Sequence, residues 1–173
     1  MAQASGGTTP GNTMDVAFPG DVEILITRTV NAPRRLVYKA WTTPELVTRW
    51  WPGRRGKMTV VDMDFRVGGA WRYVMMAHGG FEVAFHGTYR EIVPEERIVS
   101  TEVMEMPGTP PDSEDGAVVN TVTFADADDG ATLVSIRTDA GSKEVRDMIG
   151  QSGMEGGVRE QFEILEELAA SLT

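Results

Sequence analysis

The C-terminal residues 152–172 most constrain what this chain can fold into, because they form the pattern of one long amphipathic helix. Apolar residues recur there at helical spacing, and most of the acidic residues lie off that stripe. From residue 157 to residue 172 such a helix would be about 24 Å long at about 1.5 Å per residue, close to the length of a typical strand. The pattern therefore predicts one helix laid over one face of a β-sheet.

The residues before this helix predict mainly antiparallel strands joined by turns. Alternating or β-branched runs predict seven strands, at residues 21–31, 57–65, 70–78, 81–93, 98–104, 118–126 and 132–139. Two short helices are expected between the first two strands, because Pro33 and Pro44 suit first helical turns and apolar residues follow at helical spacing. A shorter helix over residues 143–151, with Ser142 as its N-cap, is expected before the long one.

A run of strands followed by one long helix indicates the α+β class. We expect residues 21–173 to form a single domain, because the chain is short for two cores. Residues 1–20 are rich in Gly, Ser, Thr and Pro and predict a disordered tail. Residues 106–117 contain Pro, Gly and acidic residues but no basic residue, and they predict a mobile loop.

Four segments carry a resemblance to a known family: VNAPRRLVYKAWTTPELVTRWW (30–51), MDFRVGGAWRYVM (63–75), FHGTYREIVPEERIV (85–99) and SGMEGGVREQFEILEEL (152–168). The chain resembles the START-like, birch-pollen-allergen-like (SRPBCC) superfamily, and within it the bacterial proteins related to the activator of the heat-shock-protein-90 ATPase. The resemblance implies the helix-grip fold, a curved antiparallel sheet of about seven strands wrapped on a long C-terminal helix. It leaves the function open, because this superfamily contains lipid carriers, hormone receptors, cyclases and co-chaperones.

A sheet that curves around a helix leaves a cavity where inward side chains do not fill the space between them. The candidate ligand-binding residues, which are expected to face inward, are Trp50, Phe65, Trp71, Tyr73, Met75, Phe85, Tyr89, Met154, Val158 and Phe162. This mostly apolar and aromatic lining suits a small hydrophobic ligand, lipid-like or aromatic, whose few polar groups are fixed by hydrogen bonds. The alternative is that the same residues form a fully packed core.

A local basic cluster, Arg54, Arg55 and Lys57, follows two adjacent tryptophans in an otherwise acidic chain. One hypothesis is that these side chains attract the carboxylate or phosphate group of an entering ligand. The alternative is that they neutralise acidic faces nearby.

The sequence predicts no catalytic residue, no cofactor and no metal site. His78 adjoins a turn and His86 falls on the predicted outer face of its strand, so neither is placed as a general base. The weak catalytic candidate is Glu91, which is expected to share the inward face with Tyr89, where burial would raise its pKa. The chain has no cysteine and no spacing typical of metal ligands.

The formal net charge of −10 disfavours nucleic acid and anionic membrane surfaces as partners. No secretory signal or membrane-spanning run is recognisable, so we expect a cytoplasmic protein. The preferred function is the binding of a small hydrophobic ligand. The alternatives are a co-chaperone-like activator of a heat-shock-protein-90 ATPase, which makes a chaperone a possible partner, and a cyclase- or hydrolase-type enzyme that uses the same cavity.

Overall fold

The computed structural model describes residues 14–110 and 113–172. Its strands are β1 (Met14–Ala17), β2 (Glu23–Val30), β3 (Gly56–Met63), β4 (Ala70–Ala77), β5 (Glu82–Val93), β6 (Arg97–Met104), β7 (Val118–Asp126) and β8 (Thr132–Asp139). Its helices are α1 (Arg34–Thr42), α2 (Pro44–Trp50), α3 (Lys143–Gly150) and α4 (Met154–Ser171), with a short 3-10 turn at Asp128–Gly130. Ser142 is the N-cap of α3, as predicted, and its hydroxyl accepts a hydrogen bond from the Val145 amide.

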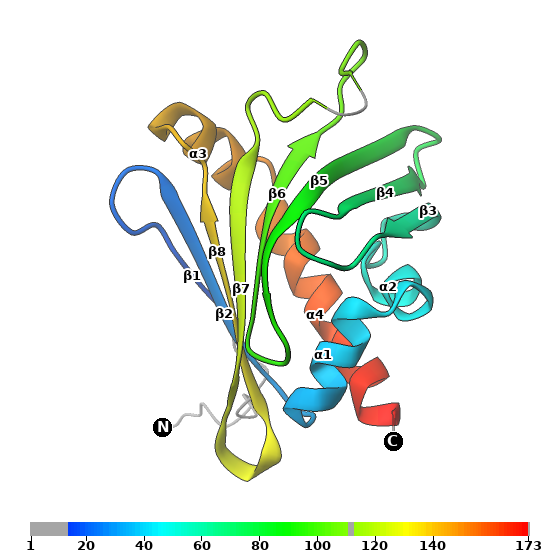
Figure 1. Cartoon of the computed structure of the whole chain (residues 1–173), viewed down its shortest axis with the longest axis vertical. Coiled ribbons are helices and arrows are strands. Elements are labelled where there is room, and N and C mark those ends of the chain that lie inside the picture. Colours follow the sequence, from blue (N-terminus) through cyan, green and yellow to red (C-terminus); the bar gives the residue numbers. More distant parts are fainter. Residues whose placement is uncertain (1–13, 111–112, 173) are drawn as a thin grey trace, which may run out of the picture.

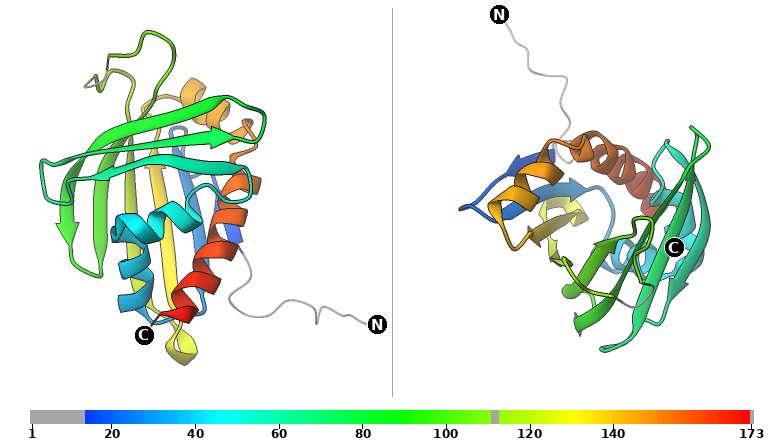
Figure 2. Two further views of the ribbon diagram at one scale, coloured as in Figure 1. Left: turned by 90° about the vertical axis from the view of Figure 1, so that its right-hand side faces the viewer. Right: turned by 90° about the horizontal axis from the view of Figure 1, so that it is seen from above.

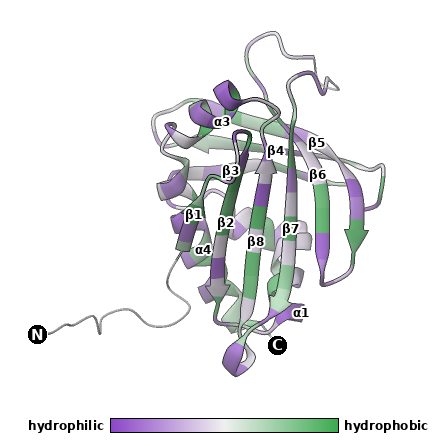
Figure 3. Cartoon of the chain, turned by 90° about the vertical axis from the view of Figure 1, so that its left-hand side faces the viewer, coloured by the Kyte–Doolittle hydropathy of each residue, from purple (hydrophilic) through white to green (hydrophobic). Residues whose placement is uncertain are grey.

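The strands form one antiparallel sheet in the order β1-β2-β8-β7-β6-β5-β4-β3. The sheet curves around α4, and α1 and α2 lie against the same helix (Figures 1 and 2). Figure 3 shows hydrophobic and hydrophilic residues interspersed along β7 and β8, as expected when one face of a strand meets the core and the other does not. The predicted α+β helix-grip fold is confirmed.

The structure has eight strands where the sequence predicts seven, because residues 14–17 form β1. This strand pairs with residues 25–28 of β2, so the expected disordered tail over residues 1–20 is wrong for that part. Residues 1–13 of the expected tail lie outside the described residues. The alternation in β1 spans only four residues, which is too short to distinguish from the polar sequence around it.

One half of the sheet, covered by α1, α2 and the C-terminal half of α4, is tightly packed; we call it the packed end. The ring of Trp41 lies 4.8 Å from that of Trp50, 5.6 Å from Phe124 and 6.3 Å from Phe162. Leu165 is fully buried beside them. Aromatic side chains of this size bury a large apolar area, so the packed end contributes substantially to the hydrophobic stabilisation of the fold.

A buried ion pair joins α4 to β2 at the packed end. The Arg28 side chain is 3% exposed, and its Nη1 lies 3.1 Å from Oε2 of Glu166. The same oxygen accepts a hydrogen bond of 2.8 Å from the Asn31 amide, and the guanidinium carbon lies 5.8 Å from the Phe162 ring centroid. Because each buried charge has its partner, Arg28 can occupy the inward face that it shares with Ile24 and Ile26.

The predicted basic cluster is held by α4. Arg54 Nη1 lies 2.8 Å from Glu163 Oε1, and Arg55 Nε lies 3.2 Å from Glu160 Oε1. Gly156 accommodates this contact, because a Cβ atom there would lie 3.1 Å from the Arg55 guanidinium. The two arginines thus neutralise acidic residues of the helix, as the alternative interpretation predicts. None of the helices in residues 14–110 and 113–172 combines the length and hydropathy needed to cross a bilayer.

Candidate functional site

All ten predicted ligand-binding residues lie in or against the hydrophobic core between the sheet and the helices. They differ in burial. The buried ones are Trp50, Trp71, Tyr73, Tyr89 and Phe162, and the half-buried ones are Phe65, Met75, Phe85, Met154 and Val158. The structure therefore brings the ten predicted residues together, but five of them are buried in the packed core.

Four of the half-buried residues lie toward one end of the molecule. Met75 is near the end of β4, Phe85 near the start of β5, and Met154 and Val158 in the first turns of α4. The β4–β5 turn, the β6–β7 loop and α3 all lie toward this end, in the upper part of Figure 1. These elements also carry exposed apolar side chains, namely Phe81, Met104, Met106 and Met148. We call this the open end, because its inward apolar side chains keep accessible surface.

A row of polar side chains crosses the inner face near the open end. Thr138 of β8 pairs with Asn120 of β7, Asn120 with Ser100 of β6, and Ser100 with Tyr89 of β5. The Thr138 hydroxyl donates to Asn120 Oδ1 at 2.6 Å, and Asn120 Nδ2 donates to Glu102 Oε1 at 3.0 Å. Because Asn120 Oδ1 is occupied by Thr138, its amide NH2 group faces Glu102.

Glu102 is the acidic residue of this inner face that the sequence does not single out. Burial raises its pKa, and the hydrogen bond from Asn120 only partly opposes that shift. Its side chain nevertheless keeps some accessible surface. Within the described residues, Oε2 of Glu102 accepts no hydrogen bond and the carboxyl group makes no ion pair. Glu102 thus has one carboxyl oxygen without a protein hydrogen-bond partner among the described residues.

The catalytic candidate Glu91 does not face inward, so that expectation is wrong. Its carboxyl group is 48% exposed and lies 2.7 Å from Arg97 Nε, and this hydrogen bond lowers its pKa. A β-bulge explains the error: Tyr89 pairs with Ser100 but Glu91 pairs with Val99, so one extra residue reverses the alternation of faces.

Aromatic rings line the inner face beside Glu102. The Trp51 ring lies 5.3 Å from Tyr73 and 5.5 Å from Phe85. The hydroxyl groups of Tyr73 and Tyr89 lie near each other, and burial raises the pKa of both. The negative charge of Glu102 raises the pKa of Tyr73 further, which indicates that the two side chains are near each other. An apolar wall and a small set of polar groups are therefore adjacent.

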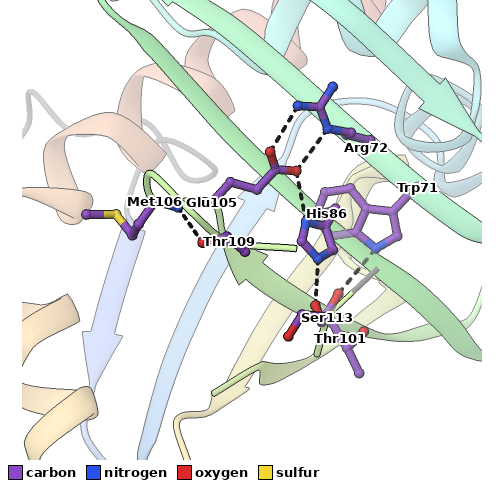
Figure 4. A network of polar contacts seen from close by, with 8 residues as sticks. All are labelled: Trp71, Arg72, His86, Thr101, Glu105, Met106, Thr109 and Ser113. Atoms are coloured by element: carbon purple, nitrogen blue, oxygen red, sulfur yellow. Dashed lines mark hydrogen bonds and ion pairs between the residues drawn. The ribbon is translucent and has the colours of Figure 1, made fainter. Parts of the chain in front are cut away.

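A second polar cluster, the outer network, lies on the opposite face of the sheet (Figure 4). The Glu105 carboxylate accepts two hydrogen bonds of 2.9 Å from Arg72, and its Oε2 lies 2.8 Å from His86 Nδ1. His86 Nε2 lies 2.7 Å from the Ser113 carbonyl oxygen, and His86 is buried although it is on the predicted outer face. The loop predicted as mobile is thus attached to the sheet by residues such as Ser113.

Glu114, from the same loop, accepts hydrogen bonds from Thr101 at 2.7 Å and Thr88 at 2.9 Å. A shallow pocket of about 290 Å³ lies between this loop and β3 to β5, lined in part by Arg72, His86 and Glu114. The polar groups of this pocket are largely paired with one another, which indicates a structural role. In the described part of the chain no group of three or more His, Asp or Glu side chains is placed to hold a metal ion.

The outer network predicts an acid-dependent stability difference. Arg72, and to a lesser degree His86, lower the pKa of Glu105 from 4.5 to about 2. A carboxyl group whose pKa is lowered by folding stabilises the folded state at any pH above its ordinary, unfolded-state pKa. This stabilisation is lost as the pH falls toward the lowered pKa of the folded state. We expect Glu105→Gln to cost about 1–3 kcal/mol at pH 7 and much less near pH 2. Denaturation of both proteins across this range tests it, and a constant difference would contradict the assignment.

Comparisons with known proteins agree with this architecture. A protein from Chromobacterium violaceum is 30% identical, with 84% of this chain and 96% of that chain covered and a TM-score of 0.70. Proteins from Rhodobacter sphaeroides and Mycobacterium smegmatis, 21% and 20% identical, have TM-scores of 0.82 and 0.80. Both alignments cover 93% of this chain. They cover 100% of the Rhodobacter sphaeroides chain and 99% of the Mycobacterium smegmatis chain. No curated protein matches the sequence.

The family model described as "Activator of Hsp90 ATPase homolog 1-like protein" matches residues 31–170. The match begins three residues before α1 and ends one residue before the end of α4, so it covers all the helices and the strands β3 to β8. The chain belongs to the family of Activator of Hsp90 ATPase homolog 1-like proteins.

Proposed function

We propose that this protein binds a small hydrophobic ligand, lipid-like or aromatic, between the sheet and α4 at the open end. The observation that carries the proposal is the incomplete burial of apolar side chains between the sheet and α4, namely Met75 and Phe85 on the sheet and Met154 and Val158 on the helix. A ligand there would remove this apolar surface from water, which is the main driving force for binding in a concave apolar site.

The remaining predicted residues form the wall beneath the ligand. Trp50 Nε1 donates to the Ala40 carbonyl at 2.9 Å and Trp71 Nε1 to the Thr101 carbonyl at 3.2 Å, so both indole donors are already used. Gly87 permits the second contact, because a Cβ atom there would lie 2.8 Å from Trp71 Nε1. Methionine side chains at the open end adapt their shape, which favours a range of related ligands.

Filling the open end is expected to block binding. We expect wild-type protein to bind the neutral dye Nile red, and Val158→Trp to weaken that binding by about tenfold, because the larger side chain occupies the ligand's space. Fluorescence titration measures both affinities. Leu133→Trp is the matched control, since Leu133 is exposed on β8 away from the site. Equal affinity in the two variants, or no dye binding to the wild type, would contradict the proposal.

The natural ligand is accessible to a direct measurement. Native mass spectrometry of the protein as purified from its own cells is expected to show a bound small molecule whose mass is absent after denaturation. The same bound species should be reduced in Val158→Trp and retained in Leu133→Trp.

The family match supports a second candidate function, a co-chaperone-like activator of a heat-shock-protein-90 ATPase. The test is ATPase stimulation of a bacterial homologue of that chaperone. Stimulation that survives Val158→Trp would support this function independently of ligand binding, and no stimulation at saturating protein would exclude it for that chaperone.

A further inference from the structure

Two acidic side chains lie between the sheet and α4, Glu166 on the helix and Glu102 on β6, and they differ in how their charge is neutralised. Glu166 lies 3.1 Å from the buried Arg28, so its charge is balanced. Among the described residues Glu102 has no such partner, and its recorded hydrogen bond comes from the neutral amide of Asn120. A carboxyl group that is partly removed from water without a cation is destabilised in its charged form.

The chain also holds this carboxyl group in place. Thr138 on β8 orients Asn120 on β7, and Asn120 binds Glu102 Oε1 on β6, so three neighbouring strands position one side chain. Oε2 of Glu102 accepts no hydrogen bond within the described residues, and the rings of Tyr73 and Trp71 lie on β4, two strands away in the sheet. Preorganised acceptors on strands are suited to recognising a donor in a fixed position.

Three basic side chains of the helices and loops near the open end are paired with acids, whereas Lys57 on β3 is exposed and forms no ion pair within the described residues. Arg55 binds Glu160 in α4, and Arg146 and Lys143 both bind Asp147 in α3. A ligand with a carboxylate or phosphate group would therefore meet the charge of Glu102, while these three cations are already paired with acids. A ligand with a positively charged nitrogen would neutralise it.

We propose that the ligand is an amphiphilic amine, with its apolar part against Met75, Phe85, Met154 and Val158 and its ammonium group on Glu102. This inference rests on the proposed function and adds the chemical class of the ligand. An ammonium–carboxylate pair with little water around it combines a charge-assisted hydrogen bond with Coulomb attraction, so the charge of the ligand decides its affinity.

The experiment compares three compounds that share one alkyl chain, namely decylamine, 1-decanol and decanoate, by displacement of Nile red at pH 7 below their micellar concentrations. We expect decylamine to bind about tenfold tighter than decanoate. Glu102→Gln should weaken decylamine by about tenfold and leave 1-decanol unchanged. Glu91→Gln, which alters the net charge equally at an exposed position, is the control and should change nothing.

The outcomes separate the two proposals. If Nile red itself does not bind, the proposed function fails. If the dye binds but none of the three compounds displaces it, the inference of an amine is overturned. If all three bind with similar affinity, or if Glu102→Gln weakens all three alike, the hydrophobic site stands and the inference of an amine is overturned. The glutamine side chain still accepts the hydrogen bond of Asn120, and the melting temperature of Glu102→Gln is expected to be at least that of the wild type, because a buried charge is removed.

Discussion

Replacement of Glu166 by alanine is expected to lower the free energy of unfolding by about 3–5 kcal/mol. The carboxylate of Glu166 neutralises Arg28, whose side chain is 3% exposed, and accepts the Asn31 amide hydrogen bond. Without it, the guanidinium group would remain buried beside Phe162 with no counterion, and this cost exceeds the value of an ordinary ion pair. Urea denaturation followed by tryptophan fluorescence measures the change.

The matched control lies one turn earlier in the same helix. Glu163 pairs with Arg54, but both side chains are about half exposed, at 45% and 55%. Glu163→Ala is therefore expected to cost less than about 1 kcal/mol. Similar losses in the two variants would show that burial of the Arg28 pair does not matter, and would contradict the role assigned to it.

Phe162→Ala is expected to cost about 3–5 kcal/mol, the second large effect. The side chain is 2% exposed and packs between Trp41 and the guanidinium group of Arg28, so its loss leaves a cavity that rigid neighbours cannot fill. A small loss would mean that Phe162 already borders free space, and would move the proposed binding site toward the packed end.

Two residues of α4 test where the packed end stops and the open end begins. Met154 lies two helical turns before Phe162 on the same stripe but is only half-buried. Met154→Ala should therefore cost clearly less than Phe162→Ala, because fewer packing contacts are lost. Equal losses in the two variants would mean that the open end is as closely packed as the rest of the core, and binding there would need the side chains to move.

The fold was accessible from the sequence because its signals were long and agreed with one another. The apolar stripe of α4, the alternation in β2 and the prolines that open the region of α1 and α2 each predict one element, and the resemblance supplies their arrangement. The ten predicted binding residues share a core for the same reason. Which of them would be packed depends on neighbours distant in sequence, and a local pattern does not contain that information.

The polar part of the site was missed for two physical reasons. The bulge at Arg90 changes the face of every later residue in β5, so Glu91 was assigned inward wrongly. In β6 the apolar Val103 is buried on the outer face and the acidic Glu102 lies on the inner face, which reverses the usual relation between polarity and burial. Alternation identifies two faces of a strand but not which one meets the helix.

The two edge strands of the sheet, β1 and β3, affect how readily further strands can pair with it. β1, with only four residues, stands beside the eight-residue β2, and β3 at the other border has a register irregularity between Met58 and Val60. A straight edge strand has unpaired backbone N–H and C=O groups, so strands of other molecules can pair with it and aggregates can grow. A short border on one side and an irregular one on the other make the addition of a further strand less favourable at both borders.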